Sequence, residues 1–154
     1  MRITDVESHS IRPPYHDFNA HTLQRYHGPL IQSRTVYVLH TDTGLHGIGE
    51  TVGHGHDEDI LREKCVGTDP FDWLNAAADL GLNMATYDLM GKHLGIPAWK
   101  LMGPKVRSWI PVAAWTVSQE PKAMAQEVRQ AAARGYRWMK YHVDEVQNVV
   151  DQAE

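Results

Sequence analysis

The clearest alternation of apolar and polar positions lies in the stretch RTVYVLHTDTGLHGIGET, residues 34–51. Val36, Val38 and their β-branched neighbours predict a strand, TDTG predicts a turn, and LHGIGE predicts the returning strand of a hairpin. Residues 1–11 alternate less regularly and are followed by two prolines. Because proline has no N–H group to donate to a sheet, this first segment is predicted to be an edge strand.

Two polar stretches flank the hairpin and predict loops. Residues 14–30 show no regular period and are rich in His, Tyr, Asn and Gly, so we expect one long loop there. Residues 52–60, VGHGHDEDI, predict a second loop that contains glycine. Loops of such length inside compact domains are often functional.

From Phe71 onward the spacing of apolar residues becomes helical. Leucines and alanines recur three and four positions apart as far as Leu89, which predicts a helix that Gly91 and Gly95 interrupt. Gly103 and Pro104 then mark a boundary between two halves of the chain.

The last third of the chain alternates between strand and helix patterns. WIPVAAW, residues 109–115, is apolar throughout and predicts a strand buried on both faces. Residues 118–135 predict a helix with Met124, Val128 and Ala131 on one face. GYRWMKYHV at 135–143 predicts the next strand, and residues 144–154 begin another helix. This order predicts a parallel sheet with right-handed crossovers. Since two parallel strands cannot bury both of their faces, the segment reads as the opening of a larger α/β domain.

The composition is that of a globular protein, with 42% of the 154 residues hydrophobic and 22% charged. The formal net charge of -4 argues against a nucleic-acid partner, which requires a basic surface. No segment is apolar for the roughly 18 residues that a membrane helix needs, and the start MRITDVESHSIRPP lacks the apolar core of a secretory signal. With the single cysteine, Cys65, these features predict a cytoplasmic protein. Cys65 is open to two interpretations, a nucleophile or a small buried residue.

Lys140 and His142 are the two ionisable residues of the strand at 135–143 that could carry chemistry. Alternate side chains of a strand share a face, so Lys140 and His142 point one way, while Met139, Tyr141 and Val143 point the other way. A histidine has an ordinary pKa near 6.5 and can act as a base near neutral pH. The alternative is a lysine that extends to solvent beside a histidine that is hydrogen-bonded in a core.

Three phrases together resemble the amino-terminal part of the enolase superfamily, in its mandelate racemase and muconate lactonizing enzyme branch. They are the hairpin VYVLHTDTGLHGIGE, the phrase ATYDLMGKHLGIPAWKLMG, and WIPVAAW followed by AAARGYRWMKYHV. The resemblance implies an α+β capping domain at residues 1–105 and the start of a TIM-type (β/α) barrel at 106–154, its first two β/α units. It also implies Mg²⁺-dependent abstraction of the proton α to a carboxylate, the task of a dehydratase, racemase or epimerase.

Residue roles follow from the resemblance position by position. Family members commonly end the second barrel strand with Lys-x-Lys, in which the first lysine helps to hold the substrate carboxylate and the second is the base. Lys140 and His142 occupy these positions here and are the expected catalytic pair, with histidine in place of the usual lysine base. The two loops correspond to the segments that close over the barrel mouth, which makes His16, His54 and His56 candidate substrate contacts.

The resemblance also bears on metals and partners. Family members hold Mg²⁺ with acidic residues of the third, fourth and fifth barrel strands, so its ligands are expected beyond Glu154 and none is assigned here. Glu50, Asp79 and Asp88 belong to the capping domain. The expected partners are a small carboxylic acid substrate and further copies of the same chain.

Three other interpretations compete with this one. The run HGHDED at 54–59 could bind a metal, but its spacing is nonspecific and a solvated charged loop explains it as well. A truncated, catalytically inactive cap-like module that binds a partner or a small acid is the alternative to an enzyme. A nucleotide-binding domain is disfavoured, because no glycine-rich phosphate loop precedes either helix of the last third.

Overall fold

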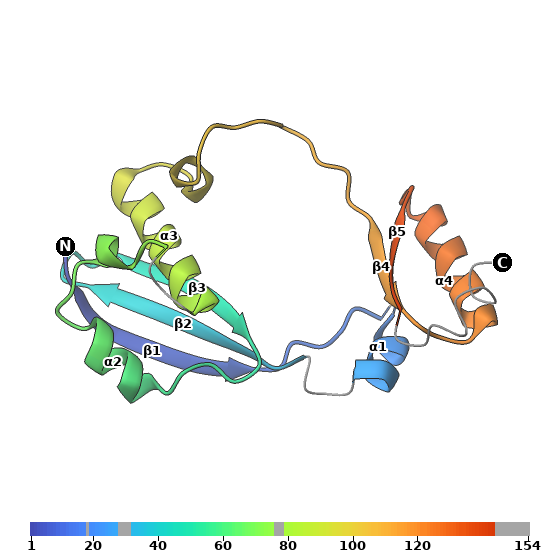
Figure 1. Cartoon of the computed structure of the whole chain (residues 1–154), viewed down its shortest axis with the longest axis horizontal. Coiled ribbons are helices and arrows are strands. Elements are labelled where there is room, and N and C mark those ends of the chain that lie inside the picture. The colour runs from blue at the N-terminus through green and yellow to red at the C-terminus, as the bar shows by residue number, and fades with distance from the viewer. Residues whose placement is uncertain (18, 28–31, 76–78, 144–154) are drawn as a thin grey trace. The chain divides into compact units, whose positions relative to one another are not determined.

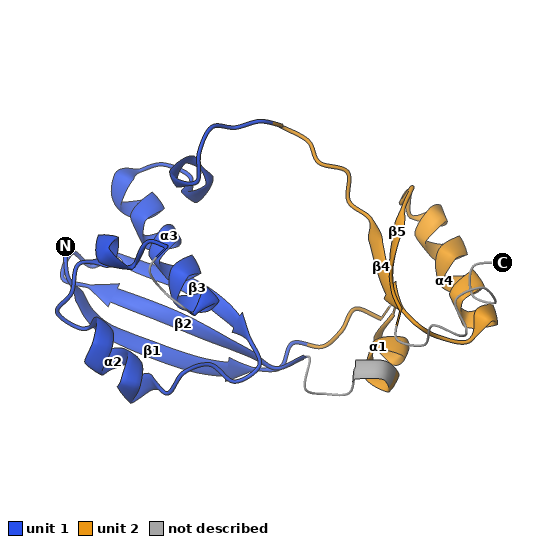
Figure 2. Ribbon diagram, viewed as in Figure 1, with its two compact units in different colours: residues 1–13, 31–106 blue, residues 14–30, 107–154 orange. Residues whose placement is uncertain are grey.

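The computed structural model describes residues 1–17, 19–27, 32–75 and 79–143. Its contacts divide the chain into two compact units (Figure 2). The first unit comprises residues 1–13 and 31–106, and the second comprises residues 14–30 and 107–154. The division into domains at 1–105 and 106–154 stays a prediction.

The first unit is built on an antiparallel sheet in the order β1-β2-β3 (Figure 1). β1 spans Ile3–Ile11, β2 spans Arg34–Thr41 and β3 spans His46–Val52. The predicted hairpin is confirmed, and so is the edge position of the first strand. Gly44 closes the hairpin turn with a φ of 79°, a left-handed conformation that favours glycine.

Two helices cover one face of this sheet, α2 at Glu58–Cys65 and α3 at Leu80–Leu94. Two short 3₁₀ turns, Pro70–Trp73 and Ala98–Leu101, complete the unit. The prediction of a loop over the whole of 52–60 was therefore wrong at its end. The Asp57 side chain accepts a hydrogen bond from the Asp59 amide at 2.9 Å and caps α2, which lets the helix begin at Glu58.

The long helix begins later and ends later than its apolar pattern predicts. Asp79 caps α3 by accepting a hydrogen bond from the Leu82 amide at 2.9 Å, so the helix proper starts at Leu80. Gly91 lies inside the helix, contrary to prediction. Gly95, with a φ of 65°, ends it as a left-handed cap.

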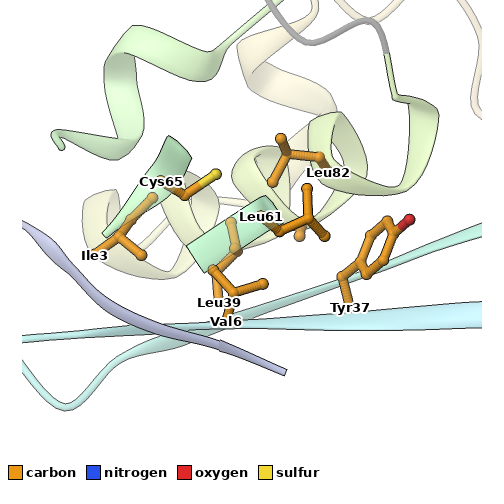
Figure 3. Close-up of a cluster of buried hydrophobic side chains, with 8 residues drawn as sticks. Ile3, Val6, Tyr37, Leu39, Leu61, Cys65 and Leu82 are labelled. Atoms are coloured by element: carbon orange, nitrogen blue, oxygen red, sulfur yellow. The ribbon is translucent and has the colours of Figure 1, made fainter. Parts of the chain in front are cut away.

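The core of the first unit lies between the sheet and these two helices (Figure 3). Tyr37 and Leu39 of β2 face Leu61 and Cys65 of α2, and Leu82 of α3 closes the cluster. The sheet face that meets the helices is thus the one that carries Thr35, Tyr37, Leu39 and Thr41, since all four are buried while the residues between them are half-buried.

The second unit contains a parallel pair of strands, β4 at Ala114–Val117 and β5 at Met139–His142. They are connected through α4 at Pro121–Ala133, and α1 at Ala20–His27 packs against β4. The predicted strand-helix-strand order is confirmed. The helix predicted at 144–154 lies outside the described residues.

Two predictions in this unit were wrong. Residues 14–30 do not form a loop throughout, because α1 buries Leu23 and Thr22 as it packs on β4. The strand predicted at 109–115 begins only at Ala114, where pairing with Met139 starts. Trp109 upstream is 90% exposed, and Pro111 has no N–H group for a ladder.

The described residues thus form an α+β unit and a parallel β-α-β unit. Within that part of the chain, the helices are all too short or too polar to cross a membrane.

Candidate active site

β5 presents Lys140 and His142 at alternate positions, and both side chains are exposed. Met139 and Tyr141 are half-buried. In the parallel register, Lys140 lies beside Trp115 and His142 lies beside Val117. The alternation expected from the sequence is present, because the two ionisable side chains share one face of the strand.

Helix α4 covers the face of this strand pair that lies opposite to Lys140 and His142. The Thr116 hydroxyl donates a hydrogen bond to the Glu127 carboxyl of α4, and Thr116 is the register partner of Tyr141. The Tyr141 hydroxyl in turn lies 3.2 Å from the Ser118 hydroxyl. Tyr141 therefore lies on the face that α4 covers, and Lys140 and His142 project from the other face.

Trp115 is a neighbour of Lys140 that sequence reasoning missed. The Lys140 ammonium nitrogen lies 5.5 Å from the centroid of the Trp115 ring, within the range of a cation–π contact. Such a contact steers the long lysine side chain along the strand pair. The signal in the sequence is an aromatic residue in the adjacent predicted strand, but only the register pairs it with Lys140.

His16, a predicted substrate contact, lines a pocket of about 240 Å³ in the second unit. The other lining residues are Asn19, Ala113, Ala114, Trp115, Arg134 and Tyr136. The Asn19 amide donates a hydrogen bond to the Trp115 carbonyl at 3.1 Å. Because the Ala114 and Ser118 amides donate toward β5, the Trp115 carbonyl faces the other edge of β4. The segment that carries His16 is thus attached to the edge of β4 opposite β5.

His54 and His56 lie in the loop after β3, in the first unit, and both are exposed. The loop is fixed by side chains from the buried face of β2. The Tyr37 hydroxyl accepts a hydrogen bond from the His56 amide at 2.8 Å and donates one to Asp79 at 3.2 Å. The Thr35 hydroxyl accepts a hydrogen bond from the Gly55 amide at 2.9 Å. The backbone that presents both histidines is therefore held by internal hydrogen bonds.

Asp79 joins this arrangement from the start of α3. Its carboxylate lies 3.5 Å from the His56 imidazole and is largely buried. Burial raises the pKa of the Tyr37 hydroxyl above its ordinary value of 10.0; the bond from the His56 amide opposes the rise, and the nearby Asp79 carboxylate adds to it. Tyr37 therefore stays protonated and able to donate. Nothing in the sequence pattern links Tyr37 with Asp79, which are 42 positions apart.

Glu50, Asp79 and Asp88, to which the sequence analysis assigned no metal, have other partners in the structure. Asp79 caps α3, and Asp88 accepts hydrogen bonds from the Ile48 amide at 2.9 Å and from Lys92 at 2.7 Å. Glu50 pairs with Arg34 at 3.5 Å. Across the ranges that the structure describes, no three His, Cys, Asp or Glu side chains gather in a group that could hold a metal ion. The described residues therefore do not by themselves provide a set of ligands for Mg²⁺.

Cys65 is fully buried in the core of the first unit. Burial raises the pKa of its thiol to about 11, although nearby Lys64 opposes the rise. A thiol with so little thiolate at neutral pH is a poor nucleophile, so the interpretation of Cys65 as a small buried residue is supported.

Comparisons with known proteins extend this picture. No family model matches the chain. In sequence it is similar to the D-galactonate dehydratase of Xanthomonas oryzae pv. oryzae (strain PXO99A), with 27% identity over 138 residues, which cover 75% of this chain and 36% of that protein. The chain thus spans about a third of the length of the curated relatives it matches.

Two solved structures share its fold. A mandelate racemase/muconate lactonizing family protein from Azoarcus sp. EbN1 matches 99% of this chain and 44% of its own, at a TM-score of 0.70 and 20% identity. A dipeptide epimerase from Methylococcus capsulatus, complexed with Mg ion, matches 92% of this chain and 44% of its own, at a TM-score of 0.68 and 21% identity.

The shared fold extends over more than nine tenths of the present chain, which forms an α+β unit and a parallel β-α-β unit. In sequence and in fold, the chain is similar to members of the enolase superfamily.

Proposed function

We propose that a protein containing this chain, at the full length of its relatives, abstracts the proton α to the carboxylate of a hydroxy acid or sugar acid. The outcome is dehydration or racemisation, as the names of a dehydratase and an epimerase among its relatives suggest. The proposal includes a barrel that residues 106–154 begin, Mg²⁺ held by residues beyond Glu154, a cytoplasmic location and self-association. The observation that carries it is the pair Lys140 and His142 on one exposed face of β5.

The two side chains divide the work by their chemistry. The Lys140 ammonium is a cation that can hold the substrate carboxylate and favours the negative charge that develops as the α-proton leaves. A neutral His142 imidazole accepts that proton on a ring nitrogen and later returns it to the product or to solvent. Both groups act from the face that α4 leaves uncovered, so no rearrangement of the strands is needed.

The exposed histidines of the loops would contact the distal part of the substrate. His16 extends from the segment attached to β4, and His54 and His56 extend from the loop fixed by Tyr37. An imidazole can donate to or accept from a hydroxyl group, which suits a polyhydroxylated acid.

Exchange of the substrate α-proton with solvent deuterium tests the proposal directly in the full-length protein. The expected result is exchange with the unaltered enzyme and a loss of at least about a hundredfold in His142→Ala, the range that general-base catalysis contributes. His93→Ala, which removes an exposed histidine of α3, is the matched control and should retain exchange. Undiminished exchange in His142→Ala would reject His142 as the base.

A second variant separates binding from proton transfer. Lys140→Met should weaken binding of the carboxylate, and Lys140→Arg should restore part of it because the charge is kept. If the unaltered protein binds small carboxylates but exchanges no α-proton with any candidate acid, the chain is a binding module and the catalytic proposal fails.

A further inference from the structure

Four polar side chains are buried together in the second unit. They are Thr22 of α1, Thr116 of β4, Gln119 of the connection that follows, and Glu127 of α4. Their exposed fractions are 9%, 0%, 6% and 6%. Buried polar groups cost free energy unless they are hydrogen-bonded, so this cluster needs internal partners.

The four side chains satisfy one another in a closed ring, here called the polar ring. The Thr22 hydroxyl donates to the Gln119 amide oxygen at 3.0 Å, and the Gln119 amide nitrogen donates to the Thr116 hydroxyl at 3.0 Å. The Thr116 hydroxyl donates to one oxygen of Glu127. The other Glu127 oxygen lies 3.4 Å from the Thr22 hydroxyl and closes the ring.

A count of hydrogens identifies the weakest contact of the polar ring. Thr22 has one hydroxyl hydrogen and two neighbouring acceptors, the oxygens of Gln119 and Glu127. The longer of the two contacts is the one to Glu127. A hydrogen-bond donor at the position of that Glu127 oxygen could donate to the Thr22 hydroxyl and complete the ring. The side-chain amide of glutamine supplies such a donor and has the same shape as the glutamate carboxylate.

We propose that Glu127 is a positioning residue, which holds the segment 14–27 against β4 through the polar ring. Thr22 is the member contributed by this segment, and Leu23 beside it is buried. The Asn19 bond to the Trp115 carbonyl continues the attachment toward His16. The polar ring thereby fixes His16 at the pocket it shares with Trp115 and Arg134. The consequence for substrate contact rests on the proposed function, but the attachment itself does not.

Backbone amide hydrogen exchange of the 154-residue chain tests this inference without any turnover. In Glu127→Met, which keeps the length of the side chain but cannot hydrogen-bond in the ring, protection of the amides of α1 should fall about tenfold or more. In Glu127→Gln protection should be kept or increased, because the amide completes the polar ring. Glu120→Gln removes a charge from an exposed carboxylate that makes no capping bond, and it should leave α1 unchanged.

Thr22→Val provides the second variant. It removes only the hydroxyl that joins α1 to the polar ring and should reproduce the loss seen in Glu127→Met, while amides of β4 and β5 stay protected. If Glu127→Met unfolds the unit and exposes β4 as well, the result of Thr22→Val decides. Equal losses in Glu127→Gln and Glu127→Met, or unchanged protection in Thr22→Val, would overturn the inference. Neither outcome bears on α-proton exchange, so failure here and failure of the proposed function remain distinguishable.

Discussion

The ammonium nitrogen of Lys140 lies 5.5 Å from the centroid of the Trp115 ring, and the two residues are register partners on parallel strands. The contact places the cation over an aromatic face on the side of the sheet that α4 does not cover. A lysine held in this way loses less conformational freedom on binding an anion than a lysine free in solvent. The arrangement suits the role proposed for Lys140.

The Lys140–Trp115 contact should be measurable as a coupling in the free energy of unfolding. A double-mutant cycle with Lys140→Met and Trp115→Leu, followed by urea denaturation, should give a coupling of about 0.5–1 kcal/mol, the range of exposed cation–π pairs. A parallel cycle with Lys140→Met and Trp109→Leu is the control, since Trp109 is 90% exposed. Equal coupling in the two cycles would show that Trp115 does not hold Lys140.

The loop that presents His54 and His56 should depend on the Tyr37 hydroxyl. Tyr37→Phe removes the acceptor of the His56 amide and the donor to Asp79, which should lower the free energy of unfolding of the first unit by about 1–2 kcal/mol. Exchange of the His56 amide should speed up at the same time. Tyr136→Phe, at a tyrosine that is 40% exposed, should alter neither quantity. An unchanged His56 amide in Tyr37→Phe would contradict the proposed anchoring.

The raised pKa of Tyr37 predicts a dependence of stability on alkaline pH. Burial raises the pKa of this hydroxyl above 10.0 in the folded chain, so the folded state binds the proton more tightly than the unfolded state does. The contribution is complete below the unfolded value and is lost as the pH rises through the folded value. The difference in free energy of unfolding between the unaltered chain and Tyr37→Phe should therefore be constant up to about pH 9 and shrink as the pH rises above about 10. A difference that stays constant above about pH 10 would show that Tyr37 does not titrate with unfolding.

The elements that could be predicted from the sequence are those whose pattern is local. The hairpin at 34–51 is predicted by a turn sequence between two short strand patterns. The helix at 118–135 is predicted by the helical spacing of its apolar residues. Even so, the sequence did not predict every residue on the buried face of a helix. Met124, Val128 and Ala131 were expected on one face of α4; Met124 and Ala131 are buried, but Val128 is 46% exposed and Glu127 is buried instead. Glu127 can be buried because the hydroxyl groups of Thr22 and Thr116 hydrogen-bond to its carboxylate. These two residues come from other elements, so the sequence of α4 alone does not indicate the burial.

The candidate site could be predicted only where strand alternation decides it. Lys140 and His142 share a face because their spacing is two, whatever surrounds them. Trp115 joined them only through the register of β4 and β5. The helix at 20–27 was missed because it has only eight residues and is largely polar, so its stability comes from the tertiary contacts of Thr22 and Leu23.

The close packing of α3 on β3 should tolerate no side chain at Gly49. A Cβ atom there would lie 1.9 Å from the Gly81 carbonyl oxygen and 2.5 Å from the Ala85 amide nitrogen. Both are backbone atoms of a helix, so they cannot move aside as a flexible side chain could. Gly49→Ala should therefore lower the free energy of unfolding of the first unit by about 3 kcal/mol, the upper part of the usual range for overpacking. Gly44→Asn is the control, since Gly44 has open space around its Cα and a φ of 79° that asparagine accepts. If urea denaturation gave equal losses for the two variants, the backbone contact between β3 and α3 would not be the constraint that these distances indicate.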